Sequence, residues 1–183
     1  KETSMKQKII ALLLTFSALL TFASSVVHAE DKATPVKSKY VISSDSSFAP
    51  FVFQDNNNQY TGIDMDLIKA IAKDQGFNIT IKNPGFDVAL NDVQTGHADG
   101  MIAGMTVTDA RKKTFDFSDS YYSANSILAV AKSSTISSYE DLKGKTVGVK
   151  NGTSSQTFLT DNQKKYGYKI KTFSDGASLY DSL

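Results

Sequence analysis

The 183-residue chain contains no cysteine, no tryptophan and only two histidines. The absence of cysteine excludes disulfides, cysteine-based zinc sites, thiol nucleophiles and the attachment point of a bacterial lipid anchor. His28 and His97 are too few for a histidine metal cluster, and none of the serines has an identifiable base. We therefore expect no metal, no cofactor and no catalytic residue.

An excess of one charge is also lacking, because 20 basic side chains stand against 19 acidic ones. The net charge of +1 gives no long-range field that would attract DNA or RNA. We expect no nucleic-acid partner. The hydrophobic share of 40% is ordinary for a globular protein.

The N-terminus combines a short basic stretch with an apolar run. Residues 5–8 carry two lysines, residues 9–22 are uncharged and largely apolar, and small residues lead to Ala29. This pattern predicts a secretory signal peptide at 5–29, preceded by upstream residues 1–4 that belong to no part of it. A retained anchor is the alternative, although a run of about 14 residues is shorter than the roughly 20 that span a bilayer. Removal of residues 1–29 leaves 17 basic and 18 acidic side chains.

Strand and helix patterns alternate after a polar linker at 30–38. We expect strands at 40–44, 78–82 and 99–104, with helices at 86–95 and from Ile63 to a stop at Gly76. Such alternation favours a mainly parallel α/β sheet.

A change of pattern divides the chain into two predicted lobes. An aromatic, acidic stretch at 114–122 and an apolar strand at 127–131 form the crossing, so lobe 1 is expected at 39–124 and lobe 2 at 125–183. Lobe 2 is expected to contain two further strands, at 145–150 and 168–173, and one full helix from about Ser154 to Tyr166. These elements cannot bury both faces of a parallel sheet. We expect a partial lobe and a fragment of a longer reading frame; a naturally short chain is the alternative.

Arg111 is the only arginine beside nineteen lysines. A guanidinium can hold a carboxylate through two parallel hydrogen bonds, which an ammonium cannot reproduce. The sequence places Thr108 at a helix N-cap and Arg111 in the first turn, where free N–H groups would also face an anion. A surface ion pair with Asp109 or Asp116 explains the arginine equally well.

Other polar and aromatic residues lie at the ends of predicted elements. Asp45, Phe48 and Phe86 suit a small ligand with an apolar stem and a polar tip, although either ring could simply belong to the core. Residues 149–154 form a strand end, a glycine turn and a helix start, without the order of a nucleotide-binding loop. Asp64 and Asp66 resemble the opening of a calcium loop, but the following ligands are missing, which favours carboxylates at a helix start.

Five blocks in order resemble the amino-acid-binding proteins of ABC importers, the bacterial solute-binding protein family 3. They are residues 45–51, 62–67, 99–111, 115–122 and 141–153. The resemblance spans residue 39 to the end and is closest to glutamine-binding domains, including those fused to their permease in Gram-positive bacteria. It implies an α/β two-lobe fold of the periplasmic-binding-protein (Venus flytrap) type, with a truncated second lobe, that closes on a free amino acid. A cleavable leader without a lipid-anchor cysteine suits a permease-fused form on the extracellular face and a free periplasmic protein alike.

The resemblance also implies which residues bind the main-chain groups of the amino acid. Arg111 would hold the α-carboxylate, helped by the backbone at Thr106, and the carbonyl of Gly104 would accept from the α-ammonium. By the same resemblance, the family's acidic partner for that ammonium is expected beyond Leu183.

The ligand side chain would be bound from both lobes. The resemblance implies that Phe48 and Phe86 hold the aliphatic stem, while Asp45 and Lys150 meet the amide. The last two implied positions, at the start of the lobe 2 helix, are Thr153 and Ser154. Ser154 stands where the family has a glycine, so its backbone contact departs from the pattern.

The function expected from this resemblance is extracytoplasmic capture of L-glutamine or a related amino acid for an ABC permease. The protein itself is expected to have no enzymatic activity. The alternative is an enzyme on the same lobes, of the dehydratase or murein lyase type. Such an enzyme needs a general acid or base, and the five blocks contain no histidine or glutamate. A scaffold module would have no small-molecule affinity at all.

Overall fold

The structure, a computed structural model, describes residues 37–183. The predicted signal peptide, the upstream residues 1–4 and most of the linker lie outside the described residues. Among residues 37–183, every helix is too short or too polar to span a bilayer.

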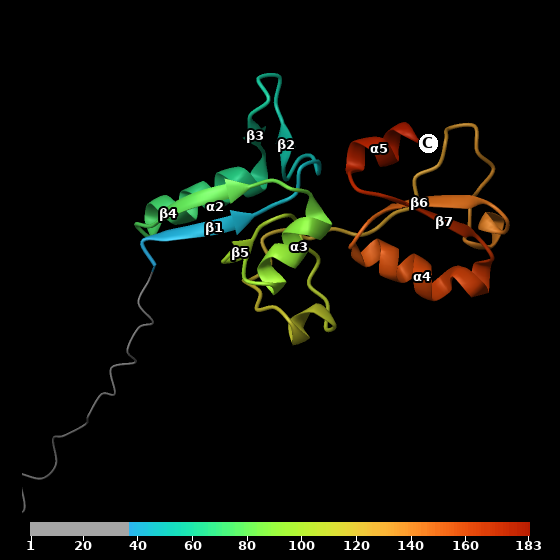
Figure 1. Cartoon of the computed structure of the whole chain (residues 1–183). Coiled ribbons are helices and arrows are strands. Elements are labelled where there is room, and N and C mark those ends of the chain that lie inside the picture. The colour runs from blue at the N-terminus through green and yellow to red at the C-terminus, as the bar shows by residue number, and fades with distance from the viewer. Residues whose placement is uncertain (1–36) are drawn as a thin grey trace, which may run out of the picture. The chain divides into compact units, whose positions relative to one another are not determined.

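The first sheet is built around β1 (Lys39–Ser43). This strand runs parallel to β4 (Asn78–Lys82) on one side and to β5 (Gly100–Met101) on the other (Figure 1). The parallel arrangement predicted from the alternating pattern is confirmed. Because the strands are parallel, the loops that leave their carboxyl ends meet at one edge of the sheet, where open α/β folds bind ligands.

The strand predicted at 99–104 is wrong beyond Met101. From Ile102 the chain leaves the sheet, and the hydroxyl of Ser44 donates to the Ile102 carbonyl in place of a further ladder bond. Gly104 then takes a φ of 53°, in the left-handed region that favours glycine. A turn therefore replaces the last part of the predicted strand.

Two helices pack on this sheet, α2 (Ile63–Asp74) and α3 (Phe86–Gln94). The first contacts β4 and the second contacts β1 and β5. Gly62, with a φ of 118°, precedes α2, and a Cβ at this position would lie only 2.4 Å from the Phe51 carbonyl oxygen. This close approach lets the N–H of Asp64 donate to Phe51 and satisfies one free donor of the first turn.

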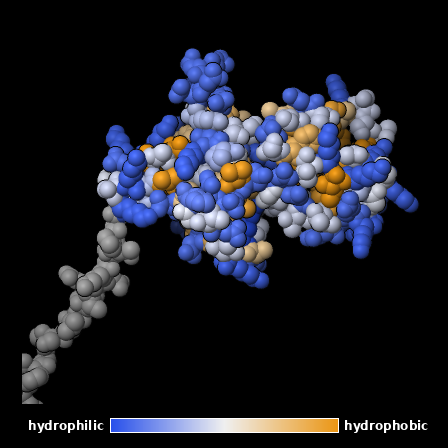
Figure 2. All heavy atoms as spheres, viewed as in Figure 1, coloured by the Kyte–Doolittle hydropathy of each residue, from blue (hydrophilic) through white to orange (hydrophobic). Residues whose placement is uncertain are grey.

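A short hairpin joins β1 to α2. Its strands β2 (Phe53–Gln54) and β3 (Tyr60–Thr61) are antiparallel and flank the turn-rich segment 55–59. Asp55 organises the turn by accepting from the N–H groups of Asn57 and Gln59. Figure 2 shows the hairpin tip as a hydrophilic projection.

The second sheet pairs β6 (Thr146–Lys150) with β7 (Lys169–Phe173) in parallel register. The connection is α4 (Ser154–Tyr166), and α5 (Gly176–Asp181) follows β7. Val147 and Val149 of β6 face the α4 side, whereas a Cβ on Gly148 would meet Leu179 of α5 at 2.7 Å. The two helices therefore cover opposite faces of this two-stranded sheet (Figure 1).

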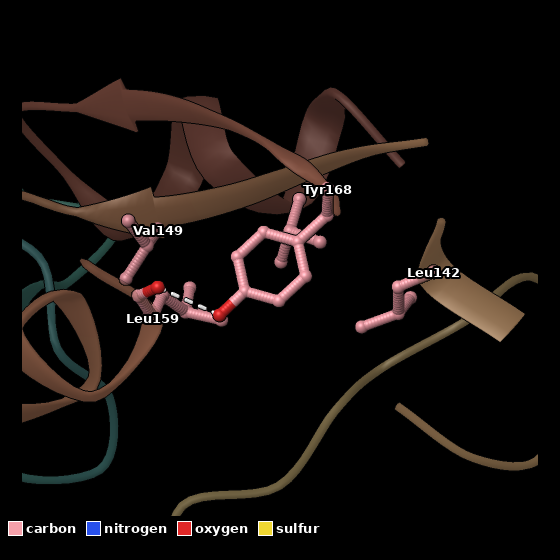
Figure 3. Close-up of a cluster of buried hydrophobic side chains, with 5 residues drawn as sticks. Leu142, Val149, Leu159 and Tyr168 are labelled. Carbon is pink, nitrogen blue, oxygen red and sulfur yellow. Dashed lines mark hydrogen bonds between the residues drawn. The ribbon is translucent and has the colours of Figure 1, made fainter. Parts of the chain in front are cut away.

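A hydrophobic cluster fills the space between β6, α4 and the short 3₁₀ turn η2 (Glu140–Leu142). The hydroxyl of Tyr168 donates to the Leu159 carbonyl at 2.7 Å inside this cluster (Figure 3). A buried hydroxyl needs such a partner. The buried members are Leu142, Val147, Val149, Leu159 and Tyr168.

The apolar strand predicted at 127–131 is wrong, because the segment has no helix or strand. Ile127 is 88% exposed, and among the described residues no strand lies alongside to accept a ladder of hydrogen bonds. The lobe boundary expected between residues 124 and 125 falls in the longer stretch 115–131, which has no helix or strand, and stays a prediction.

Candidate functional site

Asp45 lies two residues after the end of β1 and is 2% exposed. Its Oδ1 accepts from the backbone N–H groups of Ser46 at 2.7 Å and Ser47 at 3.3 Å. The Asp45 carbonyl in turn accepts from the side-chain amide of Asn83. The carboxylate is therefore held in one orientation at the carboxyl edge of the first sheet.

Lys150 is the last residue of β6, and its ammonium meets this carboxylate. Lys150 Nζ lies 2.7 Å from Oδ1 and 2.5 Å from Oδ2 of Asp45, and 3.2 Å from the Ser47 carbonyl oxygen. All three ammonium protons can thus be satisfied, as a buried charge requires. The two residues expected to hold a ligand amide between them are paired directly with each other here.

Arg111 begins the 3₁₀ turn η1 (Arg111–Lys113). Its guanidinium donates to the Thr106 carbonyl at 2.7 Å and to the Gly152 carbonyl at 2.9 Å, and its Cζ lies 5.6 Å from the centre of the Phe86 ring. Partial burial lowers the pKa of Arg111, but a guanidinium stays protonated in proteins.

The helix predicted to begin at Thr108 is wrong, because only a single 3₁₀ turn forms. Thr108 does accept from the N–H of Arg111 at 3.2 Å and, through its carbonyl, from Lys112. These bonds occupy N–H groups that were expected to face an anion. The predicted contribution of a helix terminus is therefore withdrawn, and the guanidinium remains as the group able to bind one.

The alternative explanation for the arginine, a surface ion pair, is also resolved. In the described part of the chain, Asp109 and Asp116 form no ion pair with Arg111; Asp109 instead lies 3.9 Å from Lys112.

The two phenylalanines differ in burial. Phe86 is 5% exposed at the start of α3, whereas Phe48 is 40% exposed and stacks on Phe51 with ring centres 5.0 Å apart. Phe48 also lies against Gly104, where a Cβ would come within 2.6 Å of its ring. Phe86 thus supports Arg111, while Phe48 keeps an accessible face beside Gly104.

Thr153 and Ser154 lie where α4 begins. The Thr153 hydroxyl is the N-cap, accepting from Gln156 N–H at 3.2 Å and donating to the Lys150 carbonyl at 2.8 Å. The side-chain Oε1 of Gln156 accepts from the Gly152 N–H at 2.8 Å, which makes this start a variant of the capping box. This cap fixes the Gly152 carbonyl that Arg111 contacts.

Sequence reasoning missed a hydrogen-bond network beside the site, in which the carboxylate is buried and the tyrosine, 42% exposed, lines the cleft. Asp64, in the first turn of α2, is fully buried and accepts from the Tyr121 hydroxyl at 2.8 Å. The same hydroxyl accepts from the N–H of Gly104 at 3.1 Å. Burial raises the pKa of both Asp64 and Tyr121.

All nine predicted site residues line one open cleft. Asp45, Phe48, Phe86, Gly104, Thr106 and Arg111 come from the first-sheet side, and Lys150, Thr153 and Ser154 from the second. Among residues 37–183, no group of three or more histidine, aspartate and glutamate side chains could hold a metal ion. The cleft thus offers a cation, a buried ion pair and aromatic surface.

Residues 40–171 match the family described as bacterial extracellular solute-binding proteins, family 3. The chain belongs to this family. The predicted α/β two-lobe fold of the periplasmic-binding-protein type is therefore confirmed, together with the family itself.

Relatives and solved structures carry the same family fold. The arginine-binding extracellular protein ArtP of Bacillus subtilis (strain 168) is 35% identical over 161 residues, covering 87% of this chain and 63% of the relative. Substrate-binding domain 2 of GlnP from Lactococcus lactis, solved in an open conformation, is 52% identical with a TM-score of 0.50, covering 82% of this chain and 65% of that one.

A third neighbour is the ancestral amino-acid-binding protein AncCDT-1, described as a precursor of cyclohexadienyl dehydratase. It is 36% identical with a TM-score of 0.72, and the match covers 80% of this chain and 65% of that one. The chain thus spans less than two thirds of the length of each of these three proteins.

Proposed function

We propose that this chain belongs to the extracytoplasmic receptor of an amino-acid ABC importer, and that the receptor captures a free amino acid in the cleft. The observation that carries the proposal is the Arg111 guanidinium, which lies in the cleft on the ring of Phe86 and is bound to backbone carbonyl oxygens. A ligand carboxylate offers the same fork two charged acceptors in place of neutral carbonyls, and charge-assisted bonds are the stronger kind.

The remaining groups fit the other parts of an amino acid. The Gly104 carbonyl would accept from the α-ammonium, Phe48 and Phe86 would cover the stem, and the backbone near Thr106 and Ser154 would complete the carboxylate end. Thr153 would act through the cap of α4. Each assignment combines a family position with a place on the cleft wall.

The Asp45–Lys150 pair favours a neutral side chain with an amide, and L-glutamine is our proposed ligand. An amide can enter such a pair because its carbonyl accepts from the ammonium while its NH₂ donates to the carboxylate. A cationic tip would meet Lys150 at about 4 Å, which costs roughly 4 kcal/mol at a surface-like effective dielectric.

Arginine is the second candidate, favoured by the arginine-binding relative from Bacillus subtilis. It would require Lys150 to leave Asp45, so that the ligand guanidinium could take its place. The enzyme alternative has less support: among the described residues the one histidine, His97, is exposed, bonds Thr95 and lies off the cleft. Dehydratase or lyase chemistry would need another acid or base there.

The delivery partner in this proposal is an ABC permease, either separate or in the same polypeptide. The signal peptide would bring the receptor to the extracellular face or the periplasm.

Calorimetric competition on the full-length protein tests the ligand. We expect glutamine to bind and to displace a weaker amino acid, while arginine fails to displace glutamine. Arginine outcompeting glutamine would replace the proposed ligand, and absence of binding to any free amino acid would overturn the function. If mass spectrometry detects conversion of the bound ligand into a product, the protein is an enzyme instead.

A further inference from the structure

Asp64 is a buried carboxylate whose charge is not balanced by an ion pair in the described part of the chain. Its Oδ1 is bound by the Tyr121 hydroxyl, and its Oδ2 has no hydrogen-bond partner among residues 37–183. Burial of a carboxylate with an unsatisfied oxygen is costly. Such a group calls for an explanation beyond packing.

The geometry of Tyr121 supplies one. A phenol has a single proton, and a carboxylate is the stronger acceptor, so the proton points to Asp64. The oxygen lone pairs are then free to accept from Gly104 N–H at 3.1 Å. Asp64 therefore fixes the direction of the hydroxyl, and the hydroxyl fixes the Gly104 peptide.

Gly104 has little freedom left under these contacts. Its φ is 53°, and the ring of Phe48 lies where a Cβ would be, at 2.6 Å. With the N–H held by Tyr121 and the Cα face covered by Phe48, the backbone rotations that would redirect the following carbonyl are restricted.

We propose that Asp64 and Tyr121 are positioning residues that aim the Gly104 carbonyl at the amine of the ligand. This inference rests on the proposed function, in which that carbonyl accepts from an α-ammonium. In this inference both residues act through Gly104: Asp64 is fully buried outside the cleft lining, and Tyr121 lines the cleft with its hydroxyl engaged by Asp64 and Gly104.

The test compares two ligands in the full-length protein: L-glutamine and its des-amino analogue, 4-carbamoylbutanoate. We expect Tyr121→Phe and Asp64→Ala to weaken glutamine binding about tenfold, the scale of one good hydrogen bond, with a smaller effect on the analogue. Asp64→Asn should restore glutamine binding, because its amide oxygen can still accept from Tyr121. Tyr122→Phe, at the exposed neighbouring tyrosine, is the control. An equal loss for both ligands, or no loss for either, would overturn the inference.

Amide hydrogen exchange of Gly104 provides a readout that needs no ligand. We expect its exchange to accelerate about tenfold in Tyr121→Phe and to stay near wild type in Asp64→Asn and Tyr122→Phe. If the wild-type protein binds neither ligand, the proposed function fails, and unchanged Gly104 exchange in Tyr121→Phe would separately refute the positioning role.

Discussion

Asp45 and Lys150 lie 105 positions apart in the chain and form a buried ion pair between the ends of β1 and β6. Neither residue is more than 8% exposed. Because the carboxylate also binds backbone N–H groups and the ammonium binds a carbonyl, the pair links the loops that leave the two sheets.

Removal of one partner should destabilise the protein, because the other charge stays buried and unpaired. Lys150→Met leaves Asp45 buried without its cation, and we expect the free energy of unfolding to fall by about 3–5 kcal/mol. The double variant Asp45→Asn/Lys150→Met should recover most of that loss. Urea unfolding measures both, with Lys164→Met on the exposed face of α4 as control. A Lys150→Met loss no larger than that of the control would contradict the prediction.

Arg111→Lys should remove most amino-acid binding from the full-length protein. A point charge cannot replace the two-pronged guanidinium that contacts Thr106 and Gly152, and the ligand carboxylate would be poorly paired. We expect a loss of more than about 2 kcal/mol in binding free energy. Isothermal titration calorimetry checks it, with Lys113→Arg outside the cleft as control. An unchanged dissociation constant would refute the role of the arginine.

Gly104→Ala should reduce binding more than stability. The new methyl would meet the ring of Phe48 at 2.6 Å, and this half-exposed ring can move aside only by leaving its place in the cleft. Gly96→Ala is the matched control, because Gly96 also has a positive φ but faces open space. Both variants should lose about 1 kcal/mol of stability through backbone strain, and only Gly104→Ala should lose affinity. Equal ligand affinities of Gly104→Ala and Gly96→Ala would show that binding does not depend on the present position of the Phe48 ring.

Protein stability should carry a pH signature from Asp64. Burial raises its pKa above the ordinary 3.8, with a smaller opposing effect of the Tyr121 hydrogen bond. The folded state therefore holds this proton more tightly than the unfolded state, and stability falls as pH rises from the ordinary value through the raised one. Asp64→Asn should lack this component, so its unfolding free energy should decline less between about pH 4 and pH 7. If urea unfolding gives wild type and Asp64→Asn the same dependence of stability on pH, the pKa of Asp64 is not raised.

Tyr168→Phe should cost about 1 kcal/mol of stability. The substitution keeps the ring in its hydrophobic cluster but removes the buried hydrogen bond that the hydroxyl donates to the Leu159 carbonyl of α4. Tyr180→Phe, at a tyrosine that is 71% exposed, should leave thermal stability unchanged. A Tyr168→Phe melting temperature equal to that of wild type would mean that this hydroxyl bond adds nothing to stability.

Local signals explain the elements that were predicted correctly. The predicted bounds of α4 match, because Thr153 caps its start and Gly167, with a φ of 70°, ends it. The strand at 78–82 also matches, since its alternating residues pair along the full length of β1. These features depend on neighbours in sequence or on a complete partner strand.

The wrong predictions concern segments whose conformation is set by contacts with residues far away in the sequence. The segment at 127–131 has the composition of a strand but no neighbouring strand in the described part. The turn at Arg111 stops after three residues, with its side chain bound to Thr106 and to Gly152, which is 41 positions away. No local pattern predicts such a contact.

Asp64 could have been noticed from the sequence. It stands four residues before Ile68 and eight before Ala72, on the inner stripe of α2, while Ile63 and Ile71 are partly exposed. A carboxylate on an otherwise apolar stripe marks a buried polar group. Its partner Tyr121, which lies 57 positions away, is set by tertiary structure.

The central position of β1 has a consequence for the order in which the chain folds. β1 pairs on both sides, so the first sheet cannot be completed before β5 at residues 100–101 is available. β6 and β7 need only the single helix between them, and residues 146–173 form one contiguous segment. Closing a longer loop costs more entropy and delays pairing. We therefore expect the sheet of β6 and β7 to form with the smaller kinetic barrier, and the sheet around β1 to form later, because β1 needs partners from two later segments.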